Sequence, residues 1–356
     1  MQNGLKLKSL GIGSLPHKNL EDAINIVNKY FCEIPFFPQL KNFNKNEDMI
    51  LQLLEGMPSF SADNSDNFLI DSESEQFYID LEEFFADYEE IVGDINSPKI
   101  EKYGISKKFS STFCEFEKII KNTKPQYAKG QITGPFTFST SLKDKNNNII
   151  IYDETLRDIS VKLLSLKVLW QIKHIKQANP DTIPIIFMDE PSISQIGTSA
   201  YISISTDLII DMLKEISEII KRNGGISAIH CCGKCDWRIP IKTNTDILNF
   251  DAYSFSQNFS IYHKEIKDFL INGGKIAWGF IPTSDGNILK NLTTEELVEK
   301  FKNSVKYLTN NGIDEKLIIN NSLITSSCGA GALSEEDAQK AMELVYKLSK
   351  NLRERF

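Results

Sequence analysis

The chain has 356 residues, of which 41% are hydrophobic and 25% are charged, and its formal net charge is -8. A chain of this length and composition can bury a large core, in one large α/β domain or in two ordinary ones. The negative charge and the scarcity of arginine argue against nucleic acid as a partner. No apolar run resembles a signal peptide or reaches the roughly 18 residues of a membrane helix, so we expect a cytoplasmic protein without membrane contact.

Short apolar runs alternate with amphipathic stretches along the chain, as is typical of strand–helix repeats. The apolar runs predict eight strands, at residues 7–12, 34–40, 127–132, 183–188, 226–230, 252–255, 275–281 and 317–324. The amphipathic stretches predict helices at residues 20–30, 158–177, 206–222, 294–310 and 335–352. Thr293 and Ser334 precede acidic residues and are predicted helix caps.

Eight such units favour an α/β fold with a single (β/α)8 TIM barrel over residues 1–356. The region after the second strand, residues 58–124, is predicted to be an insertion with a hairpin around residues 68–80. A doubly wound open sheet is the alternative fold. In a barrel, side chains that follow the carboxyl ends of the strands meet at one mouth, so polar residues at those positions indicate a functional site.

The stretch "AIHCCGKCDW" at residues 228–237 combines a histidine with three cysteines at the end of a predicted strand. Alternation along an extended backbone places His230 and Cys232 on one side and Cys231 on the other. His-x-Cys can therefore clamp one zinc ion, and Cys328, which follows the last predicted strand, offers a third ligand.

Two other interpretations of these cysteines stay open. Cys232 and Cys235 form a C-x-x-C pair, which occurs in redox sites and in zinc ribbons, although no second such pair is present. Small cysteines can also simply pack at the end of a strand, and we interpret Cys32 and Cys114 in this way.

Three more motifs accompany the cluster: "GIGSLPH" at residues 11–17, "QITGPFTFS" at 131–139 and "FMDEPSIS" at 187–194. With His230-x-Cys232 and Cys328-Gly329, their order resembles that in the superfamily of cobalamin-independent methionine synthase, corrinoid-dependent methyltransferases and uroporphyrinogen decarboxylase. The resemblance spans residues 11 to 329 and implies one barrel, similar to the carboxy-terminal catalytic half of methionine synthase.

The resemblance implies a methyltransferase that methylates a thiol, with homocysteine as the expected acceptor and methionine as the product. The implied catalytic zinc ligands are His230, Cys232 and Cys328, and the implied homocysteine pocket consists of Ile12, Gly13, Ser14 and Asp189. Zinc suits this chemistry because it deprotonates a thiol yet leaves the sulfur nucleophilic. A single barrel without an Asp-x-His-x-x-Gly motif favours methylcobalamin, carried by a separate corrinoid protein, as the methyl donor.

Other functions within the resemblance are methyl transfer to coenzyme M, decarboxylation of a uroporphyrinogen-like substrate, and a non-catalytic barrel that binds zinc or a corrinoid. Decarboxylation is disfavoured because the first arginine, which would bind substrate carboxylates, comes only at Arg157.

The chain also departs from methionine synthase, whose zinc site includes a glutamate at the end of the next strand. Asp251 is the only nearby carboxylate here, and we predict it at the start of that strand. Glu47 and Asp48 are candidates for the acidic part of the homocysteine pocket, and Glu190 is a candidate gating carboxylate. We interpret the other histidines, His17, His174 and His263, as structural or surface residues.

Overall fold

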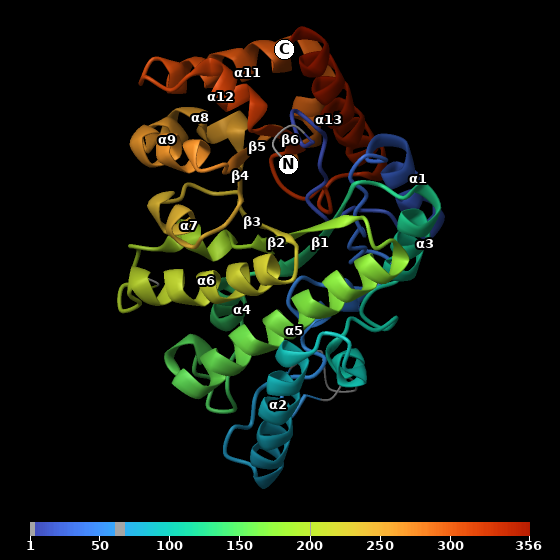
Figure 1. The fold of residues 1–356 in the computed structure, drawn as a ribbon, viewed down its shortest axis with the longest axis vertical. Coiled ribbons are helices and arrows are strands. Elements are labelled where there is room, and N and C mark those ends of the chain that lie inside the picture. The colour runs from blue at the N-terminus through green and yellow to red at the C-terminus, as the bar shows by residue number, and fades with distance from the viewer. Residues whose placement is uncertain (1–3, 61–67, 200) are drawn as a thin grey trace.

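The computed structural model describes residues 4–60, 68–199 and 201–356. Strands lie at the centre and helices surround them, while one helix, α2, projects away from the sheet (Figure 1). Within the described residues the strands are β1 Tyr127–Thr133, β2 Ile183–Asp189, β3 Ile226–Cys231, β4 Ile247–Phe250, β5 Lys275–Ile281 and β6 Ser322–Ser326.

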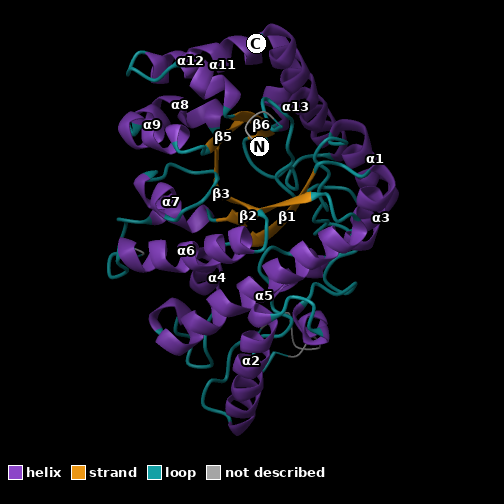
Figure 2. Ribbon diagram, viewed as in Figure 1, coloured by secondary structure: helices purple, strands orange, loops and turns teal. Residues whose placement is uncertain are grey.

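The α-helices alternate with these strands and cover the outside of the sheet (Figure 2). They are α1 Leu20–Tyr30, α2 Glu75–Gly93, α3 Phe113–Thr123, α4 Pro135–Ser141, α5 Glu154–Ala178, α6 Thr206–Arg222, α7 Arg238–Lys242, α8 Ala252–Ser260, α9 His263–Ile271, α10 Gly286–Asn291, α11 Thr294–Thr309, α12 Glu315–Asn320 and α13 Glu335–Arg355. Short 3-10 helices occur at η1 Lys45–Glu47, η2 Leu51–Leu53, η4 Pro98–Tyr103, η5 Ile150–Tyr152 and η6 Pro191–Gln195. None of the described helices is long and apolar enough to cross a membrane.

The six strands form one parallel sheet in the order β1-β2-β3-β4-β5-β6, and the sheet curls into part of a barrel (Figure 2). The α/β class is therefore confirmed, but the described residues contain six strands where eight were predicted. Residues 7–12 and 34–40 form isolated parallel bridges instead: Ser9 pairs with Ile324 of β6, and Phe36 pairs with Lys129 of β1. A complete eight-stranded barrel is not confirmed.

Side chains of β1 contact the main chain of these two segments and of the loop that follows them. Lys129, Gln131 and Thr133 alternate along β1 and so share one face. They donate hydrogen bonds to the main-chain oxygens of Ile12, Phe37 and Met49, respectively. Polar side chains from β1 therefore hold this wall of the fold.

The inward-facing positions of the strands change character along their length. Near the amino ends, apolar side chains form a separate buried cluster that includes Phe187, Ala228, Ile247, Ala277 and Leu323. Because side chains alternate with a period of two, the next inward positions are Asp189, His230, Asn249, Gly279 and Thr325. The apolar cluster thus fills the interior near the amino ends of the strands, and the polar layer lies at their carboxyl ends.

Three sequence predictions are wrong, and helix capping explains each one. The predicted hairpin at residues 68–80 runs into α2, which starts where the Ser74 side chain accepts a hydrogen bond from the Phe77 main-chain nitrogen. The predicted strand at 252–255 belongs to α8, because Asp251 caps that helix and the true strand, β4, precedes it. The predicted strand at 317–324 begins late, since Asp314 caps α12 and β6 starts only at Ser322.

Candidate metal centre

Three potential metal ligands meet at the carboxyl ends of β3 and β6. His230 is the penultimate residue of β3, Cys232 follows that strand directly, and Cys328 comes two residues after β6 ends. One ring nitrogen of His230 and the two sulfur atoms all lie within 4.8 Å of one another. One nitrogen and two sulfurs are donor types of zinc sites, and at this spacing one ion could contact all three.

The environment of His230 suits a metal ligand. The residue is only 3% exposed, and its Nδ1 lies 2.5 Å from the Oδ1 of Asn249. Its Nε2 is buried and has no hydrogen-bond partner among the described residues. A buried ring nitrogen without a partner costs free energy, and a metal ion at the cluster would satisfy it. The residues present therefore fit a zinc ion.

The two cysteines of the cluster differ in their ionisation. The Cys328 thiol and the His230 ring beside it lower the pKa of Cys232 to about 4. The contact with Cys232, together with burial, raises the pKa of Cys328 above its ordinary value. Cys232 is therefore a thiolate at neutral pH, which is the form that binds a metal.

A cavity of about 500 Å³ opens beside the cluster. The sequence-predicted residues that line it are Ile12, Ser14, Asp189, His230, Cys232 and Cys328. Gly13 packs behind this wall, where a Cβ atom would lie 3.2 Å from the side-chain amides of Gln39 and Gln131. The structure thus brings six of the seven predicted site residues to one cavity and gives Gly13 a packing reason.

Ser14 links the cavity to the loop that carries Cys328. Its hydroxyl oxygen accepts a hydrogen bond from the Gly331 main-chain nitrogen at 3.3 Å, and its main-chain oxygen accepts one from Ala330 at 2.9 Å. A Cβ atom on Gly329 would lie 2.1 Å from the Ser14 hydroxyl oxygen. A side chain at position 329 would therefore displace the Ser14 hydroxyl from its contact with Gly331.

The Asp-Glu-Pro segment places two buried carboxylates with different roles. Asp189 ends β2, and its Oδ1 is buried without a hydrogen-bond partner among the described residues. Burial raises the pKa of Asp189, while His230, when its ring is protonated, and the ammonium group of Lys129 lower it. An unpartnered carboxylate oxygen that borders a cavity is suited to bind a cationic group of a ligand.

Glu190 has a structural role. Its carboxylate accepts hydrogen bonds from the main-chain nitrogens of Phe136 and Thr137, each at 2.9 Å, and from the Thr137 hydroxyl at 2.6 Å. The group therefore fills the amino end of α4 and ties the "TGPF" segment to the "DEP" segment.

The two acidic candidates near the second predicted strand are also engaged within the protein. The Glu47 carboxylate accepts from the main-chain nitrogens of Leu40 at 2.7 Å and Ser111 at 2.6 Å. The Asp48 carboxylate lies 2.6 Å from the Lys41 ammonium. Both residues line the cavity, but their oxygens are already paired.

Gln39 is a cavity residue that the sequence analysis did not single out. Its Nε2 donates to Gln52 Oε1 at 2.7 Å, and Gln52 Nε2 donates to the main-chain oxygen of Phe109 at 2.8 Å. Because a carbonyl can only accept, the Phe109 contact fixes the orientation of both amides. The Gln39 side chain therefore keeps its Oε1 as an acceptor near Gly13 and the cavity.

Asp251 lies at the carboxyl end of β4, not at the start of a strand as predicted. Burial raises the pKa of this carboxyl group, and the negative charge of Cys232 adds to the effect. Asp251 therefore faces the same mouth as the cluster.

Cys231 and Cys235 are both buried in the core, and the neighbouring Cys235 thiol lowers the pKa of Cys231. These two cysteines are free thiols and are not part of the metal cluster.

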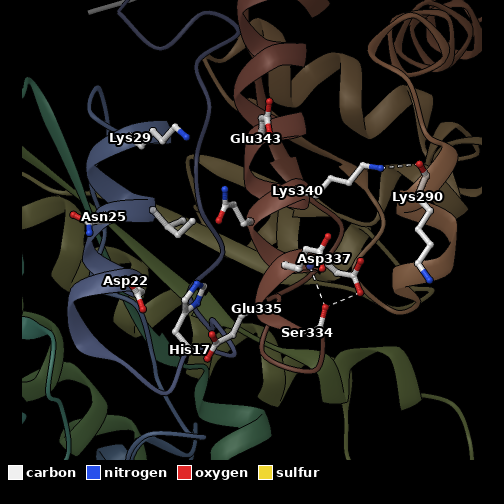
Figure 3. Close-up of a pocket in the computed structure, with 13 residues that line it drawn as sticks. His17, Asp22, Asn25, Lys29, Lys290, Ser334, Glu335, Asp337, Lys340 and Glu343 are labelled. Carbon is white, nitrogen blue, oxygen red and sulfur yellow. Dashed lines mark hydrogen bonds between the residues drawn. The ribbon is translucent and has the colours of Figure 1, made fainter.

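A second cavity, of about 1010 Å³, lies between α1, α10 and the start of α13 (Figure 3). Acidic and basic side chains line it, among them Asp22, Glu335 and Lys340. His17 borders this cavity and is 4% exposed, so it is a buried residue and not a surface one. Of the described residues that could hold a metal, only those of the His230 cluster come together.

No protein-family model and no curated protein sequence matches the chain. Among solved structures, the chain is similar to a B12-independent methionine synthase from Shewanella sp. W3-18-1, crystallised in complex with selenomethionine. The identity is 16% and the TM-score is 0.47, and the match covers 68% of this chain and 66% of that chain. The match thus spans slightly less than two thirds of that protein.

Proposed function

We propose that the protein is a zinc-dependent methyltransferase that methylates the sulfur of a small thiol, with homocysteine as acceptor. The observation that carries the proposal is the unpartnered Nε2 of His230, which lies with the sulfurs of Cys232 and Cys328 on the wall of a cavity. Two of the motifs that resemble the methionine synthase superfamily, at residues 11–17 and 187–194, also contribute residues to this cavity, and they support the same chemistry.

In this proposal His230, Cys232 and Cys328 hold the zinc ion and leave one position for the acceptor thiol. A bound zinc ion would lower the pKa of that thiol, so that the acceptor enters the reaction as a thiolate at neutral pH. The protein residues then have to hold the rest of the acceptor still while its sulfur attacks the methyl group.

The cavity offers groups that match both ends of an amino acid. The free Oδ1 of Asp189 and the Oε1 of Gln39 are acceptors for an ammonium group. The Ser14 hydroxyl accepts from Gly331, so its own hydrogen is available for the carboxylate of the ligand. This arrangement favours homocysteine over coenzyme M, which carries a sulfonate and no ammonium group.

We propose methylcobalamin, presented by a separate corrinoid protein, as the methyl donor. A cavity of about 500 Å³ is in the range that encloses small ligands, so a corrinoid would approach from the open side. In the transfer, the thiolate sulfur forms a bond to the methyl carbon while the carbon–cobalt bond breaks and its electron pair stays on cobalt. The product is a thioether, and no external oxidant or reductant is consumed.

One assay tests the function. Zinc-loaded protein is incubated with methylcobalamin or methyltetrahydrofolate as donor, and with homocysteine, coenzyme M or 2-mercaptoethanol as acceptor, and the methylated product is quantified. We expect methionine from methylcobalamin and homocysteine. Preferred transfer to coenzyme M would show that coenzyme M, and not homocysteine, is the acceptor. Transfer from methyltetrahydrofolate alone would show that the folate, and not methylcobalamin, is the donor. If zinc-loaded protein transferred no methyl group to any thiol, it would be a non-catalytic zinc or corrinoid-binding protein.

A further inference from the structure

We propose that Asn249 is a positioning residue for the metal centre, which holds the His230 ring with Nδ1 protonated and Nε2 directed at Cys232 and Cys328. The inference rests on the proposed metal site and names a residue outside its ligand set. Asn249 belongs to β4, is fully buried, and pairs in register with His230 on β3 and with Ala277 on β5.

Neighbouring groups fix the orientation of the Asn249 side-chain amide. Its Nδ2 donates to the main-chain oxygen of Ala277 at 2.8 Å and to the hydroxyl oxygen of Thr325 at 2.9 Å. The Ala277 oxygen can only accept, and the Thr325 hydroxyl uses its hydrogen for the main-chain oxygen of Ser326 at 2.9 Å. A flipped amide would place oxygen against oxygen at Ala277, so Oδ1 must face His230.

The orientation of Asn249 in turn determines the proton on His230. The Oδ1 of Asn249 has no hydrogen to give, so His230 Nδ1, at 2.5 Å, must be the donor. The neutral imidazole then carries its lone pair on Nε2, which is the buried nitrogen without a partner. Hydrogen bonds of this kind fix the ring orientation and raise the basicity of a histidine ligand.

An amide is suited to this position for an electrostatic reason. Carboxylates often hold metal-binding histidines, but this mouth already contains the Cys232 thiolate and the buried carboxyl group of Asp189. A neutral acceptor orients His230 without adding another negative charge in a buried setting. The strand register keeps the two side chains opposite each other, since His230 and Asn249 are direct partners in the ladder.

The test compares the zinc affinity of three proteins by competition with a chromophoric chelator. Asn249→Leu removes the acceptor and should weaken zinc binding by about 10- to 100-fold. Thr325→Val disturbs the same buried group but leaves Asn249 its bond to Ala277, so the affinity should change by no more than about threefold. Equal losses in both variants would indicate general packing damage, and full affinity in Asn249→Leu would overturn the proposal.

A measurement on the unaltered protein keeps the proposal testable if Asn249→Leu does not fold. Long-range 1H–15N correlation spectra of the metal-free protein report which ring nitrogen of each of the four histidines is protonated. At a pH high enough to leave the ring neutral, we expect the His230 signal, identified by its loss in His230→Gln, to show its single proton on Nδ1. A proton on Nε2 would overturn the assignment. Failure of the unaltered protein to bind zinc would instead refute the proposed metal site, so the two failures are distinguishable.

Discussion

Substitution of Asp189 by asparagine tests how the cavity recognises its acceptor. The Asp189 Oδ1 has no partner within the described residues, so the change removes one charge-assisted hydrogen bond to the ammonium of homocysteine and no internal bond of that oxygen. Such a bond contributes about 1.5 to 3 kcal/mol. At about 1.4 kcal/mol for each factor of ten, the Kd of homocysteine should rise roughly 10- to 150-fold.

The assay is isothermal titration of zinc-loaded Asp189→Asn and unaltered protein with homocysteine and with 4-mercaptobutyrate. The second thiol is homocysteine without its amino group, so it serves as the matched control. We expect the substitution to weaken the binding of homocysteine, to leave the binding of 4-mercaptobutyrate unchanged, and to leave the zinc content unchanged. Equal weakening of both thiols would show that Asp189 shapes the cavity without binding the ammonium. Unchanged homocysteine affinity would return Asp189 to a purely structural role.

Three further predictions concern pH, backbone packing and metal-linked stability. Burial lowers the pKa of His174, but Glu117 and a second carboxylate outweigh it and raise the pKa above 6.5. The resulting stabilisation is present below pH 6.5 and is lost as the pH rises through the raised pKa. In urea unfolding, the free energy of unfolding of the unaltered protein should therefore fall over this pH range, and that of His174→Gln should not. An equal fall in both proteins would contradict the assignment. Gly279→Ala places a Cβ 2.5 Å from a main-chain oxygen and should lower the free energy of unfolding by about 1 to 3 kcal/mol. Gly93→Ala is the control, because its Cβ would meet nothing within 4 Å, and it should not lower the free energy of unfolding in this way. Similar losses in both variants would refute the packing argument. Zinc should raise the Tm of the unaltered protein but not that of Cys328→Ser, and equal shifts would argue against the cluster as the binding site.

Much of the fold could be predicted because local signals and tertiary structure agree there. Helices at residues 20–30 and 206–222 start and end as predicted, since each combines a polar cap with one apolar face. The buried strands β1 to β3 also lie within one residue of their predicted bounds, and β2 is the clearest of them, because it is a short apolar run that ends at Asp189. His230, Cys232 and Cys328 could be grouped because each one lies at or just after the carboxyl end of a strand.

Other features depended on contacts that the sequence does not reveal. Residues 7–12 and 34–40 have strand-like composition, but they form isolated bridges, and side chains of β1 donate to the main-chain oxygens of Ile12 and Phe37. The position of Asn249 was missed because the strand was predicted five residues too late, at 252–255 and not at Ile247–Phe250. A polar residue within the run "ILNF" was the available signal. The same shift misplaced Asp251, which lies at the carboxyl end of that strand.

Zinc K-edge X-ray absorption tests the central claim most directly, because it counts the sulfur atoms bound to the metal. The proposed ligands are one histidine and two cysteines, so the zinc-loaded protein should show two sulfur ligands. Addition of homocysteine should raise the count to three as the acceptor thiol takes the open position. A count that stays at two with saturating homocysteine, or purified protein that binds no zinc, would contradict a zinc-activated thiol as the basis of the activity.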